Sequence, residues 1–279
     1  MKLLTLNTHS LAEPNQEEKL TWFAQMINHE KPEIFALQEV NQTLSKPITD
    51  VEKDLGYIFC EGNKEPIRED NYALRLARRL KEMGCSYQWT WTAAKIGYKI
   101  YAEGLALFSC IPIEQTKQFF ISRGQDFANW KTRKILGIQV NNTWYYSVHM
   151  GWWNDDEEPF AMQWNRAEEA MKKSAEPGEN IWVLGDFNSP ADKKGEGYEY
   201  VKASGWQDSY ELAKEKDTGI TVGGVIDGWR NTQDNEQKEG MRIDYIWCRQ
   251  KETIHQSAVV CSGSKYPVVS DHYGVMIVK

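Results

Sequence analysis

The feature that most constrains this chain is a set of polar side chains placed in, directly before or directly after its predicted strands. Lys2 to Asn7, Ile34 to Val40 and Ile181 to Gly185 are short apolar runs typical of buried strands. The polar residues associated with such strands fall at six places: Asn7, Gln38 and Glu39, His149, Asp186 and Asn188, Asp244, and Asp271 and His272. Burying one such group without a partner costs on the order of a few kcal/mol. Six such positions, each buried without a partner, would be too costly, so we expect the strand ends to converge on one polar pocket where these side chains serve as partners for one another.

The remaining pattern predicts a sheet-rich α/β fold. Alternating or late strands are predicted at Tyr87–Thr92, Gly104–Ser109, Arg133–Val140, Trp144–Met150, Arg242–Arg249, Ser257–Ser262 and Gly274–Val278. Asn141-Asn142 suits a tight hairpin, because Asn tolerates positive φ. Helical periodicity covers Asn15 to His29, Asn71 to Met83 and Glu157 to Ser174. Since hairpins separate the helices, we expect two packed sheets with helices outside, an α/β sandwich.

Two helix starts are predicted from capping signals. Asn15 can cap the first helix, with Glu18 completing a capping box, and Asp70 can cap the second.

Composition favours a single domain spanning residues 1–279. No Pro/Gly/Ser-rich linker or internal repeat divides the 279 residues, and 41% of them are apolar. The net charge of −7 disfavours a general nucleic-acid binder, which usually carries a basic surface. The five cysteines are scattered without a C-x-x-C pair. The apolar run at the start of the sequence is too short for a signal segment, and no apolar run approaches the roughly 20 residues of a membrane span. We therefore expect a cytoplasmic protein with reduced thiols, no membrane association and no obligate protein partner.

The polar residues also predict a chemistry. Glu39, Asp186 and Asp271 offer hard carboxylate oxygens, and Asn7 and Asn188 add amide oxygens, a donor set that suits Mg²⁺ or Mn²⁺. Two histidines, at 149 and 272, remain for proton transfer. No serine or cysteine stands out as a nucleophile, so water is the expected attacking group.

Taken in order, these residues carry a family resemblance. The motifs are Leu6-Asn7-Thr8, Gln38-Glu39-Val40, Gly185-Asp186-Phe187-Asn188, Arg242-Ile243-Asp244-Tyr245 and Ser270-Asp271-His272. Together they resemble the endonuclease/exonuclease/phosphatase superfamily of deoxyribonuclease I-like hydrolases. The resemblance implies a four-layer α-β-β-α sandwich of two mainly antiparallel mixed sheets with helices outside.

The resemblance also implies roles for single residues. The residues that would hold the metal are Asn7, Glu39 and Asp271. Asp244 would orient His272 as the general base, while Asp186 is an alternative base or a second metal ligand.

On the substrate side, His149 and Asn188 would contact the phosphoryl oxygens. Glu103 matches the position that pairs with the first histidine, and Arg133 matches a phosphate-contacting arginine. His9, His29 and His255 match no motif, and we expect them at the surface.

The substrate is less constrained than the chemistry. Trp152 and Trp153 follow His149, and if they line the pocket they suit a sugar or a nucleoside. The segment Val225 to Gly240 adds Trp229 and Arg230. A narrower resemblance is carried by the stretches Asn7 to Ser10, Gln38 to Asn41, Glu69 to Leu74, Tyr87 to Trp91 and Arg242 to Tyr245. In these the chain is similar to the bacterial branch that includes maltose-phosphate phosphatase.

These features favour an Mg²⁺- or Mn²⁺-dependent phosphoesterase acting on a small-molecule sugar phosphate. The alternatives are a nuclease that cleaves DNA or RNA phosphodiesters, which an aligned basic groove would support, and a non-catalytic binding module.

Overall fold

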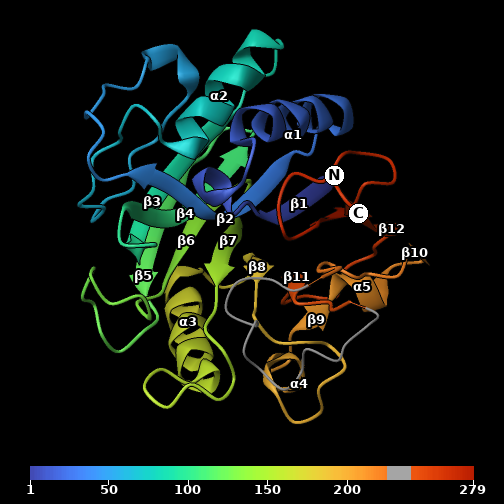
Figure 1. Cartoon of the computed structure of the whole chain (residues 1–279). Coiled ribbons are helices and arrows are strands. Elements are labelled where there is room, and N and C mark those ends of the chain that lie inside the picture. Colours follow the sequence, from blue (N-terminus) through green and yellow to red (C-terminus); the bar gives the residue numbers. More distant parts are fainter. Residues whose placement is uncertain (225–239) are drawn as a thin grey trace.

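The computed structural model describes residues 1–224 and 240–279, and the strands within these ranges form two sheets (Figure 1). Trp229 and Arg230 lie outside the described residues. The first sheet runs, in spatial order, through β10 (Glu215–Lys216), β12 (Gln256–Val260), β13 (Gly274–Val278), β1 (Lys2–Asn7), β2 (Ile34–Thr43), β4 (Tyr101–Ser109) and β3 (Gln88–Gly97). The second runs through β5 (Gln115–Phe120), β6 (Lys134–Val140), β7 (Thr143–His149), β8 (Asn180–Asp186), β11 (Asp244–Cys248) and β9 (Gln207–Asp208).

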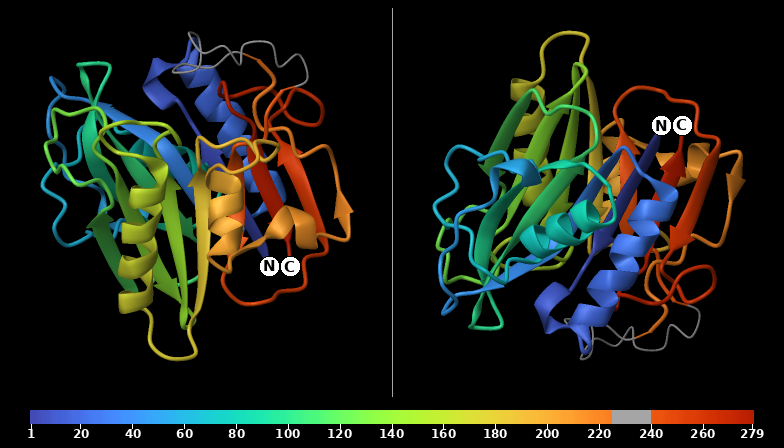
Figure 2. Two further views of the ribbon diagram at one scale, coloured as in Figure 1. Left: turned by 90° about the horizontal axis from the view of Figure 1, so that it is seen from below. Right: turned by 90° about the horizontal axis from the view of Figure 1, so that it is seen from above.

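Helices cover the outer face of each sheet (Figure 2). On the first sheet, α1 (Gln16–Glu30) and α2 (Tyr72–Glu82) bury an apolar stripe that includes Phe23 and Leu76. On the second, α3 (Phe160–Ser174) and α4 (Gly197–Ala203) pack residues such as Trp164 against the strands. A third cluster, which includes Leu107 of β4 and Leu184 of β8, fills the space between the sheets. This is the predicted four-layer sandwich.

Both sheets are mixed, and most of their strand pairs are antiparallel. The parallel pairs are β1–β2, β7–β8 and β10–β12. The remaining helical elements are short: η1 (Ser10–Ala12), η2 (Lys53–Leu55) and α5 (Ser209–Leu212). No helix within the described residues is long and apolar enough to cross a membrane.

Local predictions had mixed outcomes. The hairpin between β6 and β7 is confirmed, with φ of 48° at Asn141 and 56° at Asn142. The capping box of α1 is wrong: Asn15 has a φ of 57°, and its side chain makes no capping hydrogen bond. Asp70 does not cap α2 either, because the side chain of Asn71 accepts from the backbone N–H of Leu74. Instead, Asp70 accepts a hydrogen bond from the backbone of Thr43 on β2.

The sheet edges also differ from the prediction. Strand β3 continues to Gly97, beyond the predicted end at Thr92. Strand β5 was not predicted, since its half-exposed sequence QTKQFF has no clear alternation. The cysteines are free: those at 60, 248 and 261 are buried, Cys85 is half-buried and Cys110 is exposed.

The strand register gathers the polar strand ends. His149 of β7 lies opposite Asp186 of β8, and Asp186 lies opposite Asp244 of β11, so the three form one row across the second sheet. Asn7 ends β1 in the first sheet, and its side-chain amide donates to Asp186 Oδ2 across the two sheets at 3.0 Å. The predicted convergence of strand ends is therefore present.

Candidate active site

The centre of the site is a pair of carboxylates joined by one amide. Asn7 Nδ2 donates to Glu39 Oε1 at 2.9 Å and to Asp186 Oδ2 at 3.0 Å. Burial and the charge of Glu103 raise the pKa of Glu39 to about 7. Burial also raises the pKa of Asp186 to about 6, against the opposing effect of His272. Both carboxylates are thus held close to other negative charge with few donors to stabilise them.

A histidine–aspartate pair lies beside Asp186. His272 Nδ1 is 2.9 Å from Asp244 Oδ2, and its Nε2 is 3.8 Å from Asp186 Oδ2. Burial alone would lower the pKa of His272, but the charges of Asp244 and Asp186 outweigh it and raise that pKa to about 10. Asp244 Oδ1 is buried and has no hydrogen-bond partner within residues 1–224 and 240–279. The pairing with Asp244 fixes the ring of His272 with Nε2 turned toward Asp186.

Glu39 reaches the site because its strand is irregular. The pairing of β2 with β4 shifts register between Leu37 and Val40, and Glu39 itself has a φ of 51°. A bulge of this kind adds a residue to one strand and redirects its side chains. The irregularity therefore turns the Glu39 carboxylate toward Asn7 rather than leaving it in the regular alternation of β2.

The donor set fits a divalent cation. Glu39, Asp186 and Asp271 supply carboxylate oxygens, the ligands that Mg²⁺ and Mn²⁺ prefer. Burial is the main reason that the pKa values of Glu39 and Asp186 are raised, and the charges of Glu103 and Asp271 on Glu39 and of Asp244 on Asp186 add to it, so a cation would offset this buried negative charge. Asn7 is oriented differently from the expectation, because its Oδ1 accepts from the backbone N–H of His9 at 3.2 Å and its amide nitrogen faces the carboxylates. Its amide would have to rotate by half a turn to offer oxygen to a metal.

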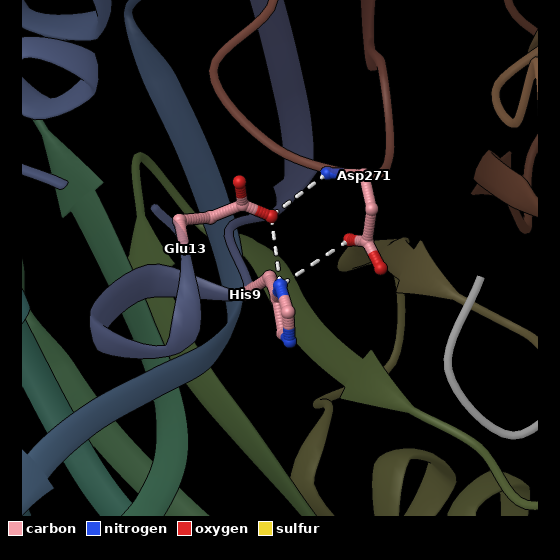
Figure 3. Close-up of side chains that lie close together, drawn as sticks. All are labelled: His9, Glu13 and Asp271. Atoms are coloured by element: carbon pink, nitrogen blue, oxygen red, sulfur yellow. Dashed lines mark hydrogen bonds and ion pairs between the residues drawn. The ribbon is translucent and has the colours of Figure 1, made fainter. Parts of the chain in front are cut away.

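A second cluster is formed by His9, Glu13 and Asp271 (Figure 3). Glu13 Oε1 accepts from the backbone N–H of Asp271 at 3.1 Å and lies 2.7 Å from His9 Nδ1. Asp271 Oδ1 is 3.9 Å from the same ring nitrogen. Burial opposes protonation of His9, but the hydrogen bond to Glu13 and the charges of Glu39 and Asp271 raise its pKa to about 9.

The prediction that His9 lies at the surface is therefore wrong, because its ring is largely enclosed between these groups and Tyr98. The remaining oxygen of Glu13 pairs with Lys19 of α1. The three residues of this cluster could hold a cation, as could Asp186, Asp244 and His272.

The residues expected to contact phosphate lie in the same pocket. His149 Nε2 is 3.7 Å from Asp186 Oδ2, and burial together with the charges of Arg133 and Lys95 holds its pKa well below the ordinary value. Asn188, at a φ of 46°, donates its backbone N–H to Asp186 Oδ1 at 2.8 Å and its Nδ2 to the Met150 carbonyl at 2.9 Å. A neutral imidazole beside a fixed amide suits contact with phosphoryl oxygens.

Glu103 has a different partner from the one that the resemblance implied. Its Oε1 lies 3.1 Å from Lys95 Nζ, and both side chains are almost fully buried. Within the described part of the chain, no hydrogen bond or ion pair joins Glu103 to His149. Lys95 was not singled out from the sequence, because it was expected to lie beyond the end of its strand.

One pocket joins most of these groups, although Asn7, Glu13 and Asp244 do not line it. It is lined by His9, Glu39, Lys95, Ile96, Gly97, Tyr98, Glu103, Trp130, Arg133, His149, Trp152, Asp186, Asn188, Asp271 and His272. The rings of Trp130 and Trp152 lie 5.6 Å apart at its wall. Trp153 does not line it and packs instead against Phe160 and Tyr200. Of the two tryptophans predicted to bind substrate, the structure brings only Trp152 to the site.

The comparisons with known proteins agree on the family. The model described as "Endonuclease/Exonuclease/phosphatase family" matches residues 4–272. An endonuclease/exonuclease/phosphatase family protein from Leptotrichia buccalis C-1013-b superposes with a TM-score of 0.85 at 29% identity, covering 100% of this chain and 98% of that one. No curated protein sequence matches.

Two further solved structures share the fold at lower identity. A mannosyl-6-phosphatase from Bacteroides thetaiotaomicron VPI-5482 has a TM-score of 0.66 and 16% identity, covering 100% of this chain and 98% of that one. A 3′ phosphatase from Neisseria, bound to product DNA hairpin, has a TM-score of 0.62 and 17% identity with the same coverage.

Proposed function

The chain belongs to the endonuclease/exonuclease/phosphatase family, whose members are hydrolases that act on phosphoester bonds, and from this premise we propose that it releases phosphate from a sugar phosphate. The fold does not select the substrate, because its structural relatives include both a mannosyl-6-phosphatase and a 3′ phosphatase bound to DNA. The substrate has to be argued from the pocket.

The observation that carries the proposal is the aromatic wall next to the phosphate-contacting groups. Trp130 is 49% exposed and its ring centroid lies 5.6 Å from that of Trp152, so part of the Trp130 surface is accessible to a ligand. Both rings line the same pocket as Arg133 and His149. A flat apolar surface beside polar hydrogen-bonding groups suits the apolar face and hydroxyls of a sugar ring. The negative net charge of the chain disfavours a long polyanion in its place.

We assign the chemistry to water activated in this pocket. Glu39 and Asp271, with Asn7 after rotation of its amide, would hold a divalent cation, which when bound supplies charge neutralisation and polarises the phosphoryl group. His272 Nε2 and Asp186 Oδ2 face each other at 3.8 Å. Because the pKa of His272 is raised to about 10, its ring is protonated near neutral pH, and Asp186, with a pKa of about 6, is the group placed to take the proton from water. Asp244 keeps the His272 ring in position, and His149 and Asn188 stabilise charge on the phosphoryl oxygens.

The test is a substrate panel with purified protein. Sugar phosphates, nucleotides and plasmid DNA are incubated with Mg²⁺ or Mn²⁺, with and without a chelator, and released phosphate and DNA nicking are measured. We expect chelator-sensitive phosphate release from sugar phosphates and intact DNA. Chelator-sensitive nicking with no release from sugar phosphates would replace this proposal with a nuclease, and no turnover of any substrate would favour a binding module.

A further inference from the structure

The pocket contains a buried cation that the catalytic assignments leave unused. Lys95 lies on β3, where the pairing with β4 shifts register between Ala93 and Lys95. The shift places Lys95 directly opposite Glu103, and the two side chains form an ion pair at 3.1 Å. Its side chain is 11% exposed, and burial together with the charge of Arg133 lowers its pKa. Burying an ammonium group costs free energy unless an opposite charge or hydrogen-bond acceptors replace the water that it loses.

Glu103 compensates only part of that cost. An ammonium group has three N–H donors, and Glu103 is the one acceptor among the described residues that pairs with Lys95. Space for Glu103 exists because residue 97 is glycine: a Cβ there would lie 2.2 Å from Glu103 Oε2. The ion pair therefore fixes Lys95 at the pocket wall and leaves donors available to a ligand.

Arg133 is a second cation that lines the same pocket. Its Nη1 donates to the carbonyls of Trp130 at 2.8 Å and Thr132 at 3.3 Å, which holds the guanidinium in place. The residue is only 4% exposed, and its Nε is buried without a hydrogen-bond partner among the described residues. Two buried cations, Lys95 and Arg133, thus line a pocket that also contains His149 and Asn188.

We propose that Lys95, held by Glu103, is a specificity-determining residue that binds a terminal phosphate oxygen and selects phosphomonoesters over phosphodiesters. This inference rests on the proposed phosphatase function. A phosphomonoester carries close to two negative charges near neutral pH and offers three terminal oxygens. A phosphodiester carries one charge and two terminal oxygens, since the third is esterified. The additional charged oxygen of the monoester is the acceptor that Lys95 and Arg133 together can satisfy.

The test compares two substrates with the same leaving group. The ratio of kcat/KM for p-nitrophenyl phosphate to kcat/KM for bis-p-nitrophenyl phosphate is measured for the unmodified protein and for Lys95→Met, which keeps the length of the side chain and removes its charge. We expect the ratio to fall at least about tenfold, the factor that corresponds to losing one charge-assisted hydrogen bond. Lys173→Met is the matched control, because Lys173 is exposed on α3 and pairs with Glu169 away from the pocket. An unchanged ratio in Lys95→Met would overturn the inference.

Two further measurements keep the test decisive. Lys95→Met leaves Glu103 without its cation, so the double variant Lys95→Met/Glu103→Gln restores a neutral pair in case the single variant does not fold, and the same fall in the ratio is expected. Binding of inorganic phosphate, followed by calorimetry, should weaken at least about tenfold in either variant and needs no turnover. If the unmodified protein hydrolyses no phosphate ester but its phosphate affinity depends on Lys95, the proposed function fails and the site stands. If it hydrolyses both substrates and neither measurement depends on Lys95, the site fails and the function stands.

Discussion

The carboxylate of Glu13 gives the most direct prediction about metal binding. Glu13 touches no expected substrate group, yet its Oε1 accepts from the Asp271 backbone at 3.1 Å and lies 2.7 Å from His9 Nδ1 (Figure 3). Its second oxygen pairs with Lys19. If Asp271 is a metal ligand, Glu13 is the residue that holds it, and Glu13→Gln should weaken metal binding while Glu39, Asp186 and Asp271 all keep their carboxylates.

The magnitude follows from the contacts that are lost or weakened. A glutamine can still accept from Asp271, but it forfeits the charge that pairs with His9 and Lys19. One charge-assisted hydrogen bond contributes about 1.5–3 kcal/mol, and loss of an outer partner of a ligand typically costs about 10–100-fold in metal affinity. We therefore expect the Mg²⁺ dissociation constant to rise about tenfold or more, with kcat at saturating Mg²⁺ reduced far less.

The assay is a calorimetric titration of chelator-treated protein with Mg²⁺, repeated with Mn²⁺ by electron paramagnetic resonance. Glu17→Gln serves as control, since Glu17 lies nearby in the first turn of α1, is 73% exposed and also pairs with a cation, Arg75. Unchanged affinity for both ions in Glu13→Gln would show that the Glu13 contacts do not organise the metal site. A fall in kcat at saturating metal with unchanged metal affinity would show that Glu13 contributes to the hydrolysis step and not to metal binding.

Three further predictions follow from the site. Asp186→Ala and His272→Ala should each lower kcat by about 10³-fold or more while circular dichroism of the metal-free protein stays native, and near-native turnover in both would refute the assignment. The pKa of His9 is raised to about 9, so its contribution to folding stability is full below its unfolded value of about 6.5 and is lost as pH rises toward 9. Denaturant titrations of the metal-free protein should show that loss, and a His9→Gln variant with the same pH slope would contradict it. Trp152→Ala should raise KM for sugar phosphates with little change in Tm. Trp153→Ala should instead lower the free energy of unfolding by about 2 kcal/mol with KM nearly unchanged, because Trp153 packs against the core. The opposite pattern would exchange the roles of the two tryptophans.

The part of the site that could be predicted from the sequence is the part set by regular strand pairing. Asn7, His149, Asp186 and Asp244 stand at strand ends, and apolar periodicity locates those ends without knowledge of the fold. Sheet register then places His149, Asp186 and Asp244 in one row. A polar residue at the end of a buried strand can be recognised in the sequence because it interrupts an apolar run, and in the structure these residues do lie at strand ends.

The missed residues share the opposite property. His9 and Glu13 lie on either side of a single 3-10 turn, whose start has a φ of 45° at His9. Such a turn has no periodicity, so nothing in the sequence indicates that the two side chains converge on Asp271. The spacing of four residues between a histidine and a glutamate, directly after a strand, is the one signal that could have suggested a contact. Trp130 was missed for a similar reason, since it lies in the segment between β5 and β6.

The bulges explain why the chemistry of the pocket is easier to read than its specificity. Glu39 lies within a register shift between β2 and β4, and Lys95 directly follows one between β3 and β4, on the opposite side of β4. Glu39 was found because it belongs to a recognisable motif, whereas Lys95 stands in the run Ala93-Ala94-Lys95-Ile96, where strict alternation gives no reason to turn its ammonium toward the pocket. The extra residue in β3 places Lys95 rather than Ala94 opposite Glu103. Under the proposal that Lys95 selects phosphomonoesters, one insertion in an edge strand would set the charge preference of the pocket, while the row of His149, Asp186 and Asp244 in the second sheet stays unchanged.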